Sequence, residues 1–497
     1  MRRKRTIYFN DARHYYLFVF EPPMTLEDAW IPIDEVAGTA IDTFAYGVER
    51  GDGLFYPSKI GLRFGADMKP FPMGAYWRVW NNMQSLMDRG LDPLRVLIDR
   101  AHDRGMDFIA SVRMPSFGGM NPNWATTSGG GGLALKEVQD HQMRILDELM
   151  TDYPIEGLEL DVSFPGGGRN VRPEDAERML PALSDYVERI REQVEAKSGG
   201  RIHLGARVYP TEALNLEDGL DVREWLHRGL LDYVAPLRYG YMLLDPDQPI
   251  DWLIEAAHRA DTAAYGFLQP YIRDSSIGAP DVAHPTLEHA RAAAANYWSK
   301  GVDGLYTWFM QWPLGDTERS ILTELGHSDA VHQKSRIYTL GRAVVKPEPL
   351  SYPQPLPVEI LFDATNTPFP VSFYLADDFV RDRQRIASVQ VRIRIFDLVT
   401  ADRLTIRLNG RSLSGELCTR SMHSRYTPYY GQWLAFTLTN SWPRKGYNTL
   451  EFVLEGRPLD LVGPLKIEEI EIEVDYGFFP TTGIVGPTPS VDASVTG

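Results

Sequence analysis

The feature of this sequence that most constrains its fold is a regular alternation of short β-rich runs with longer helical patterns. The alternation extends from residue 15 to 326 and repeats eight times. Eight such units over roughly 310 residues are typical of a (β/α)8 barrel, the TIM-barrel fold of the α/β class. A doubly wound open sheet is the alternative, because strands are hard to count from one sequence. The expected strands span 15–20, 39–48, 107–114, 157–163, 202–209, 233–239, 264–271 and 304–309.

The segments between these runs carry helical signals. In the clearest one, apolar residues recur at helical spacing from Met179 to Val194, and Pro173 with two acidic residues opens the segment. Another runs from Leu94 to Ala101 and ends at Gly105, since glycine is typical just past a helix C-terminus. These helices are of the kind that connect parallel strands.

The chain changes character after the expected barrel domain, which covers residues 1–340. Residues 341–358 are dense in proline and are typical of a linker. Beyond them the hydrophobic period becomes two, and Asn409-Gly410 is a strong hairpin signal. We therefore expect an all-β sandwich as an accessory domain over 359–480. The last residues, 481–497, are typical of a flexible tail.

The composition limits which partners and cofactors we expect for this chain. The net charge of -16 argues against a nucleic-acid partner, and no apolar stretch has the length of a membrane span. Cys418 is the single cysteine and the histidines lack ligand spacing, so we expect no metal and no other cofactor. The basic start, residues 1–5, is followed too soon by polar residues to be an export signal. We expect a cytoplasmic chain; the alternative is a secreted or periplasmic one whose signal peptide has been removed. The oligomeric state is not indicated.

The most informative strand is the run 157–164, GLELDVSF. A side-chain period of two points Glu159, Asp161 and Ser163 into the barrel. Burying a carboxylate costs free energy unless it is paired with a cation or kept for catalysis. The active sites of such barrels form at the C-terminal ends of the strands. Asp161 lies nearer that end, so it is the first catalytic candidate. Glu159 lies one layer deeper, as a second candidate or as the partner of a buried arginine.

A second carboxyl group is needed for acid catalysis. We prefer Glu212, in the loop after 202–209, because a loop carboxylate beside Asp161 could reach across a sugar ring. The alternative is that Glu212 is a solvated loop acid. Asp274, just after 264–271, is the rival.

Arginines and aromatic residues gather at the same strand ends. Arg113, Arg207 and Arg238 can neutralise Glu159 and Asp161, but three cations against two acids leave room for an anionic substrate. Asn10, Asp11 and His14, just before the first expected strand, are further candidates to cover the mouth. Aromatic rings pack against sugars, although they are as common in a core. The remaining candidate substrate-binding residues are Tyr209, Tyr239, Trp308, Gln311, Trp312 and Trp124.

Three segments carry a family resemblance: GLELDVSF, LIDRAHDRGMDFIASVRM and VDGLYTWFMQW. Over roughly residues 7–326 the chain resembles bacterial glycosyl-hydrolase-like TIM barrels that are relatives of the family-ten-like glycosyl hydrolases. The resemblance implies a carbohydrate substrate, a strand-end acid corresponding to Asp161, and an appended β-sandwich that is structural or binds carbohydrate. One position departs from the pattern. Many retaining relatives keep a glutamate at the end of the seventh strand, where this chain has Gln269, which puts the two-glutamate retaining mechanism in question.

We hypothesise a glycoside hydrolase that acts on a poly- or oligosaccharide, anionic ones included, with Asp161 as nucleophile or base. The first alternative is a barrel that binds carbohydrate without cleaving it. The second is a polysaccharide lyase that uses Tyr209 or Tyr239 as a base against a uronic acid.

Overall fold

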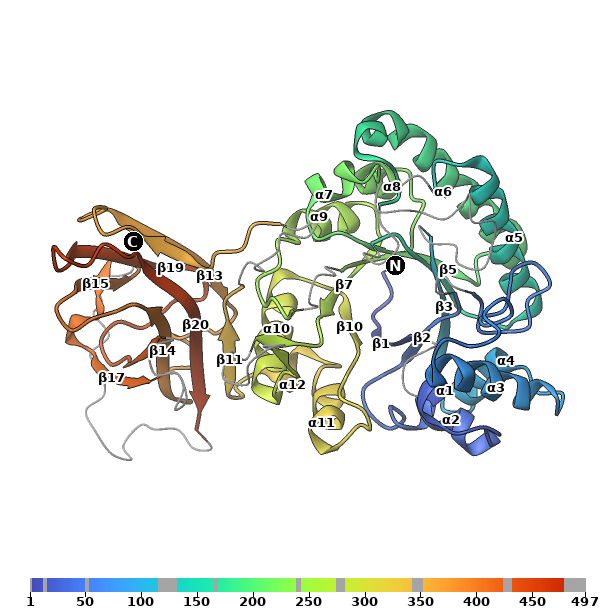
Figure 1. Cartoon of the computed structure of the whole chain (residues 1–497), viewed down its shortest axis with the longest axis horizontal. Helices are drawn as coiled ribbons and strands as arrows, with labels where there is room; N and C mark the ends of the chain where they lie inside the picture. The colour runs from blue at the N-terminus through green and yellow to red at the C-terminus, as the bar shows by residue number, and fades with distance from the viewer. Residues whose placement is uncertain are drawn as a thin grey trace.

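The computed structural model has two β-rich units, a closed barrel and a sandwich that lies beside it (Figure 1). This arrangement confirms the expected fold class. The structure describes residues 2–11, 16–49, 53–114, 132–163, 169–237, 243–273, 282–341, 352–422 and 431–477.

Eight parallel strands close the barrel in the order β1-β10-β7-β6-β5-β4-β3-β2. Their bounds are Thr6–Asp11 (β1), Thr43–Gly47 (β2), Asp107–Arg113 (β3), Gly157–Asp161 (β4), His203–Val208 (β5), Tyr233–Pro236 (β6), Ala263–Leu268 (β7) and Gly304–Trp308 (β10). A short hairpin of Ile272–Arg273 (β8) and Val282–Ala283 (β9) follows β7. The helices surround the strands (Figure 1). They are Tyr16–Val19 (α1), Leu26–Asp34 (α2), Gly74–Met87 (α3), Pro93–Asp103 (α4), Lys136–Asp152 (α5), Ala176–Ser198 (α6), Glu212–Glu217 (α7), Val222–His227 (α8), Asp251–Arg259 (α9), Leu287–Lys300 (α10), Asp316–Glu324 (α11) and Ser328–Val331 (α12).

The first barrel strand lies earlier than the sequence analysis placed it. We expected it at 15–20, but residues 16–19 form α1 and the strand is β1, Thr6–Asp11. β1 pairs with β10 on one side and with β2 on the other, so it needs apolar residues on both faces. Ile7 and Phe9 supply the inner face, and Tyr8 supplies the outer one. The prediction for 15–20 was wrong, although the number of strands was right.

Side chains alternate between the barrel interior and the layer under the helices. Leu158 and Leu160 of β4 pack in the outer layer, which leaves Glu159 and Asp161 on the inner face. The interior is filled by a cluster from the other strands, which includes Ile7, Phe9, Ala45, Ile109, Tyr233, Tyr265, Phe267, Tyr306 and Trp308.

The two clearest helical patterns form the expected helices. α4 begins where the Asp92 side chain accepts hydrogen bonds from the backbone N–H groups of Leu94 and Arg95. It ends before Gly105, which has a φ of 74° and therefore the left-handed backbone that suits glycine. α6 covers the run from Met179 to Val194.

The sandwich contains two antiparallel sheets. One has the order β11-β20-β14-β18-β17, with β12 also on β20, and the other has the order β13-β19-β15-β16. The bounds are Arg336–Thr339 (β11), Val358–Ile360 (β12), Pro368–Leu375 (β13), Ile386–Phe396 (β14), Arg403–Leu408 (β15), Arg411–Ser412 (β16), Leu417–Met422 (β17), Gln432–Thr437 (β18), Gly446–Gly456 (β19) and Leu465–Tyr476 (β20). As the period of two predicts, Val391, Ile393 and Ile395 point into the core between the sheets.

The sandwich takes its first strand from before the proline-dense segment. β11 pairs with β20 and packs on α10, whose Ala292 joins the apolar core of the sandwich. The sheet therefore begins at residue 336, whereas we expected the sandwich from 359. Most of the proline-dense segment, 342–351, and the tail 481–497 lie outside the described residues. Within the described ranges, no helix combines the length and the apolarity needed to cross a membrane.

Closure of the barrel between its first and last strands leaves no room for a side chain at Gly304. A Cβ there would lie 1.9 Å from the backbone oxygen of Arg5. We expect Gly304→Ala to destabilise the barrel by about 3 kcal/mol, because backbone has to move. Gly463→Ala, at an open position, should change stability by less than about 0.5 kcal/mol. Calorimetric unfolding of both variants checks this, and equal melting temperatures would contradict it.

Candidate active site

Four charged residues meet at the C-terminal mouth of the barrel. Asp11, Arg113 and Asp161 are the last residues of β1, β3 and β4. Arg207 stands opposite Asp161 in β5, and Asp161 stands opposite Arg113, so these three side chains lie at one level. The exposed fraction of each of the four residues is 4% or less.

Two arginines link three carboxylates into a continuous chain. Arg207 binds Asp161 (Nη2 to Oδ2, 2.8 Å) and Glu159 (Nε to Oε1, 3.0 Å). Arg113 binds Asp11 (Nη2 to Oδ2, 2.8 Å) and lies near Asp161 (Nε to Oδ2, 3.7 Å). We call this series, Glu159–Arg207–Asp161–Arg113–Asp11, the carboxylate–arginine chain. Asp161 stands at its centre and contacts both arginines.

Glu159 is the buried anchor of this chain. Its carboxylate accepts hydrogen bonds from the hydroxyl groups of Ser111 (2.7 Å), Tyr306 (2.9 Å) and Tyr233 (3.1 Å). Complete burial raises the pKa of Glu159, while Arg207 acts to lower it. Because these partners lie within the barrel, Glu159 holds Arg207 in place. This is the second role that the sequence analysis gave Glu159, the partner of a buried arginine.

Glu212, the preferred proton donor, is bound elsewhere. It is the first residue of α7, and both its carboxylate oxygens bind Arg223, at 2.5 and 2.9 Å. This hydrogen-bonded pair lowers the pKa of Glu212. A general acid needs a raised pKa. The side chain is also 38% exposed, so Glu212 matches the alternative of a solvated loop acid, and the structure speaks against the donor role.

Tyr209 takes part in a buried hydrogen-bond cluster rather than facing an open mouth. Its hydroxyl donates to Asp218 (3.1 Å), which also accepts from the side chain (2.5 Å) and backbone N–H (3.0 Å) of Asn170. Burial raises the pKa of Asp218 to about 7 and that of Tyr209 well above 10. A lyase base needs the opposite shift, so Tyr209 is unsuited to that role. The cluster ties the segment after β4 to the β5–α7 connection.

Trp308 and Gln269 lie on neighbouring strand ends. The Trp308 indole donates to Gln269 Oε1 (3.4 Å) and packs between Phe9 and Phe267, with ring centroids 5.9 and 5.8 Å away. Trp308 is 2% exposed, so it closes the top of the barrel interior. Gln311 is exposed and lines a mainly apolar cavity next to the same strands.

Trp312 contacts residues on either side of α2 in the sequence. Its indole N–H donates to Glu35, at the end of α2 (3.0 Å), and its ring lies edge-on to Phe20. Burial raises the pKa of Glu35 to about 8, while the bond from Trp312 acts to lower it. These contacts place Trp312 between the outer helices.

Several candidates lie outside the described residues: Asp274, Arg238, Tyr239, Trp124 and His14. Within the described ranges, no group of three or more His, Cys, Asp or Glu side chains is placed to hold a metal ion.

The catalytic candidates of the sequence analysis did not include Asp11. Its signal was the run Thr6–Asp11, in which Ile7, Phe9 and Asp11 share one face, but this run was not taken as a strand. With Asp11 counted, the described part of the mouth has two carboxylates and two arginines, and Glu159 lies one layer deeper. Arg238, the third expected cation, lies outside the described residues, so the expected excess of cations stays a prediction. Ser163 is a further inward residue, and its buried hydroxyl has no hydrogen-bond partner among them.

Comparison with curated proteins gives a partial match. No protein-family profile matches the chain. The protein named glycosyl hydrolase DigH from Escherichia coli O6:H1 is 26% identical over 205 residues, covering 30% of this chain and 46% of that protein. Proteins of the same name from Escherichia coli K12 and Shigella flexneri match with the same identity and coverage. The chain thus spans less than half the length of the curated relatives it matches.

Solved structures share the general architecture at low similarity. An alpha-L-fucosidase from Vibrio sp. strain EJY3 has a TM-score of 0.40 and 11% identity, covering 94% of this chain and 96% of that one. Alpha-L-fucosidase isoenzyme 2 from Paenibacillus thiaminolyticus has a TM-score of 0.41 and 12% identity, covering 66% and 49%. A class V chitinase from Pseudomonas fluorescens Pf-5 has a TM-score of 0.39 and 13% identity, covering 64% and 98%. Similarities this low carry no functional argument.

The buried and exposed arginine pairs predict different effects on stability. Arg207→Met leaves Glu159 and Asp161 buried without their cation, so it should lower the free energy of unfolding by about 3–5 kcal/mol. Arg223→Met breaks the exposed pair with Glu212 and the contact of the guanidinium with the Trp252 ring (5.5 Å), and it should cost about 1 kcal/mol or less. Urea unfolding of the two variants measures the difference. Equal losses would contradict the proposed role of Arg207.

The raised pKa of Glu35 predicts a pH-dependent stability. Because the folded protein holds the Glu35 proton more tightly than the unfolded chain does, this contribution is complete below about pH 4.5 and is lost as the pH rises through about 8. Glu35→Gln cannot ionise, yet it can still accept the Trp312 hydrogen bond. We expect its melting temperature to match wild type near pH 4.5 and to exceed it at pH 9. A difference that does not change with pH would rule out this titration.

Proposed function

We propose that this chain is a glycoside hydrolase that cleaves a poly- or oligosaccharide at the mouth of the barrel, with Asp161 as nucleophile or base. The observation that carries the proposal is the position of Asp161 at the C-terminal end of β4, next to a guanidinium, Arg113, that also binds the carboxylate of Asp11. Glycosidic hydrolysis uses two carboxyl groups around one bond. The partial match to proteins named glycosyl hydrolase supports the same proposal. We also propose that the chain is a relative of the family-ten-like glycosyl hydrolases.

The charges around Asp161 suit a nucleophile or a base. Two guanidinium groups, those of Arg207 and Arg113, face its carboxylate at 2.8 and 3.7 Å. These contacts fix the position of the carboxylate at the mouth, as a nucleophile or base that must meet the substrate in one geometry requires.

The proton donor in our proposal is Asp274, with Asp11 as the rival, because Asp11, like Glu212, is held in an ion pair with an arginine. Asp11 lies on the other side of Arg113 and comes from the neighbouring part of the barrel. The separation of the two carboxyl groups decides between retention and inversion of the anomeric centre. Product stereochemistry therefore tests the pair.

The substrate in this proposal is an uncharged glycan. Both described arginines of the mouth are bound to carboxylates, so the described charges there balance. This balance favours an uncharged sugar over an anionic one. The Ser163 hydroxyl, which has no hydrogen-bond partner within the described ranges, supplies a hydrogen bond for a sugar hydroxyl.

A second candidate function is a barrel that binds carbohydrate without cleaving it. Two observations favour it: Gln269 stands where many retaining glycosidases have a glutamate, and each described mouth carboxylate is held in an ion pair. It predicts that a glycan binds and is recovered intact.

A glycan panel with matched variants tests the hydrolase. Purified protein is incubated with neutral, uronate-containing and sulfated glycans, and released reducing ends are counted. We expect cleavage of a neutral glycan that falls at least about a thousandfold in Asp161→Asn, because the reacting carboxylate is lost. Glu212→Gln, at the exposed pair, should keep the wild-type rate. Circular dichroism confirms that both variants are folded.

The outcomes separate the candidate functions. Cleavage that survives Asp161→Asn would contradict the proposed nucleophile. Binding without cleavage on the whole panel would favour the binding barrel, and an unsaturated product that absorbs in the near ultraviolet would indicate a lyase.

Substrates with different leaving groups can identify the proton donor. An aryl glycoside with an acidic phenol needs no protonation to depart. If Asp274 is the donor, Asp274→Asn should cleave such a glycoside well but the natural glycan poorly, whereas Asp11→Asn should cleave both. The reverse pattern would assign the role to Asp11.

A further inference from the structure

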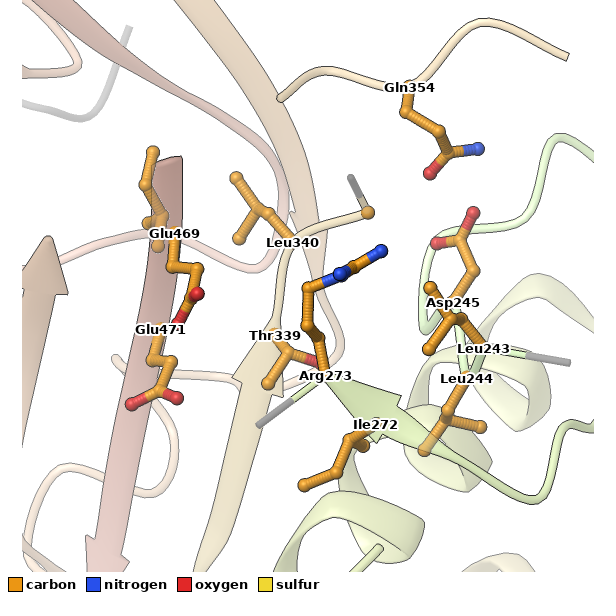
Figure 2. Close-up of a pocket in the computed structure, with 12 residues that line it drawn as sticks. Leu243, Leu244, Asp245, Ile272, Arg273, Thr339, Leu340, Gln354, Glu469 and Glu471 are labelled. Carbon is orange, nitrogen blue, oxygen red and sulfur yellow. The ribbon is translucent and has the colours of Figure 1, made fainter. Parts of the chain in front are cut away.

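A pocket lies where the barrel meets the sandwich (Figure 2). On the barrel side it is lined by residues 243–245, after β6, and by β8, after β7. On the sandwich side it is lined by 339–341, Gln354 and 469–471 of β20. The volume of this pocket is about 40 Å³, and a neighbouring cavity of about 160 Å³ shares Asp245, Gln354 and residues 339–341 with it, so the two together supply the room for a sugar unit.

The pocket opens on the active-site face of the barrel. Both barrel segments follow the C-terminal ends of their strands, which is the face that carries the carboxylate–arginine chain. The two segments are joined, because Leu244 donates its backbone N–H to the Tyr271 oxygen at 2.6 Å. A glycan that leaves the mouth over β6 and β7 would therefore reach the sandwich at this pocket.

Three polar side chains face the same space. Figure 2 shows the guanidinium of Arg273, the carboxylate of Asp245 and the amide of Gln354 turned toward one another. Asp245 is fixed by the Tyr352 hydroxyl, at 2.6 Å. Both polar atoms of the Gln354 amide are buried and lack a hydrogen-bond partner within the described ranges. Such an amide is costly to leave unsatisfied, and a ligand with hydroxyl groups satisfies both its donor and its acceptor.

The charges of the pocket select an uncharged ligand. Glu469 and Glu471 on β20 are each bound by an arginine, Arg394 and Arg392, that also binds a second glutamate, so this wall carries no excess of cations that would hold an anionic ligand. Of the remaining lining residues, Arg273 and Asp245 carry opposite charges. The walls also include aliphatic side chains, which suit the C–H faces of a sugar ring. They are Leu243, Leu244, Ile272 and Leu340.

From these observations we infer that this pocket is a remote subsite that binds a neutral sugar unit of the same glycan that the barrel mouth cleaves. The inference rests on the proposed function for its substrate. It gives the sandwich a direct part in recognition of long chains, through Gln354 and β20.

Binding of short and long sugars tests the subsite. The probes are di- and hexasaccharides of the cello-, xylo- and chito-series, titrated by calorimetry into wild type, Gln354→Leu and the control Gln384→Leu, whose glutamine is exposed before β14. We expect one hexasaccharide to bind wild type and the control equally, and Gln354→Leu about fivefold or more weakly, as for one lost hydrogen bond. Disaccharide binding at the mouth should not change.

A second variant displaces the Gln354 amide without changing this residue. A Cβ at Gly341 would lie 1.8 Å from Gln354 Oε1, so Gly341→Ala should weaken the hexasaccharide in the same way. Melting temperatures verify that both variants fold. Equal hexasaccharide affinity in all proteins, or no binding by any probe, would overturn the subsite.

Chromatography of the recovered sugar separates the two proposals. Binding that depends on Gln354, with the sugar intact, keeps the subsite and rejects the hydrolase. Cleavage with no dependence on Gln354 or Gly341 keeps the hydrolase and rejects the subsite.

Discussion

The charge of Arg207 inside the barrel is the interaction on which the site depends. A buried carboxylate is costly without a partner, and β4 carries two of them, Glu159 and Asp161, on its inner face. Arg207 binds both from the adjacent strand, and its guanidinium also lies over the Phe9 ring at 4.2 Å. The hydroxyl groups around Glu159 fix the lower end of this arrangement. Asp161 is therefore held at the mouth by Arg207, which Glu159 positions from the layer below.

The inner face of the barrel could be predicted from the sequence because strand periodicity is local. The alternation in GLELD puts Glu159 and Asp161 on the same face of the strand, and the eight β-then-α units predict the barrel. Both predictions depend on residues that are neighbours in the chain. Asp11 was expected only to cover the mouth, and its strand was missed because the apolar run at 15–20 competed with β1, although a short helix satisfies such a run equally well. The contacts of Glu212 and Trp312 could not be predicted, because they depend on how separate helices pack.

The position of the sandwich against the barrel depends on contacts between distant parts of the chain, which local sequence patterns do not predict. β11 precedes the proline-dense segment, yet it pairs with β20 near the end of the described chain and lies on α10 of the barrel. Figure 1 shows these elements where the two units meet. Segments from both units thereby come together on the active-site face. The pocket of Figure 2 has this origin, so the sandwich is positioned to extend the site that the barrel begins.

The most direct test of the account is a crystal structure of Asp161→Asn with the glycan that wild type cleaves. The account predicts a sugar ring at the barrel mouth with its anomeric carbon about 3–3.5 Å from the side chain at position 161, the distance of a reacting pair. It also predicts that Arg207 keeps its bond to Glu159. A glycan bound elsewhere on the chain, with position 161 closed off by the two arginines, would contradict the central claim that this carboxylate carries the reaction.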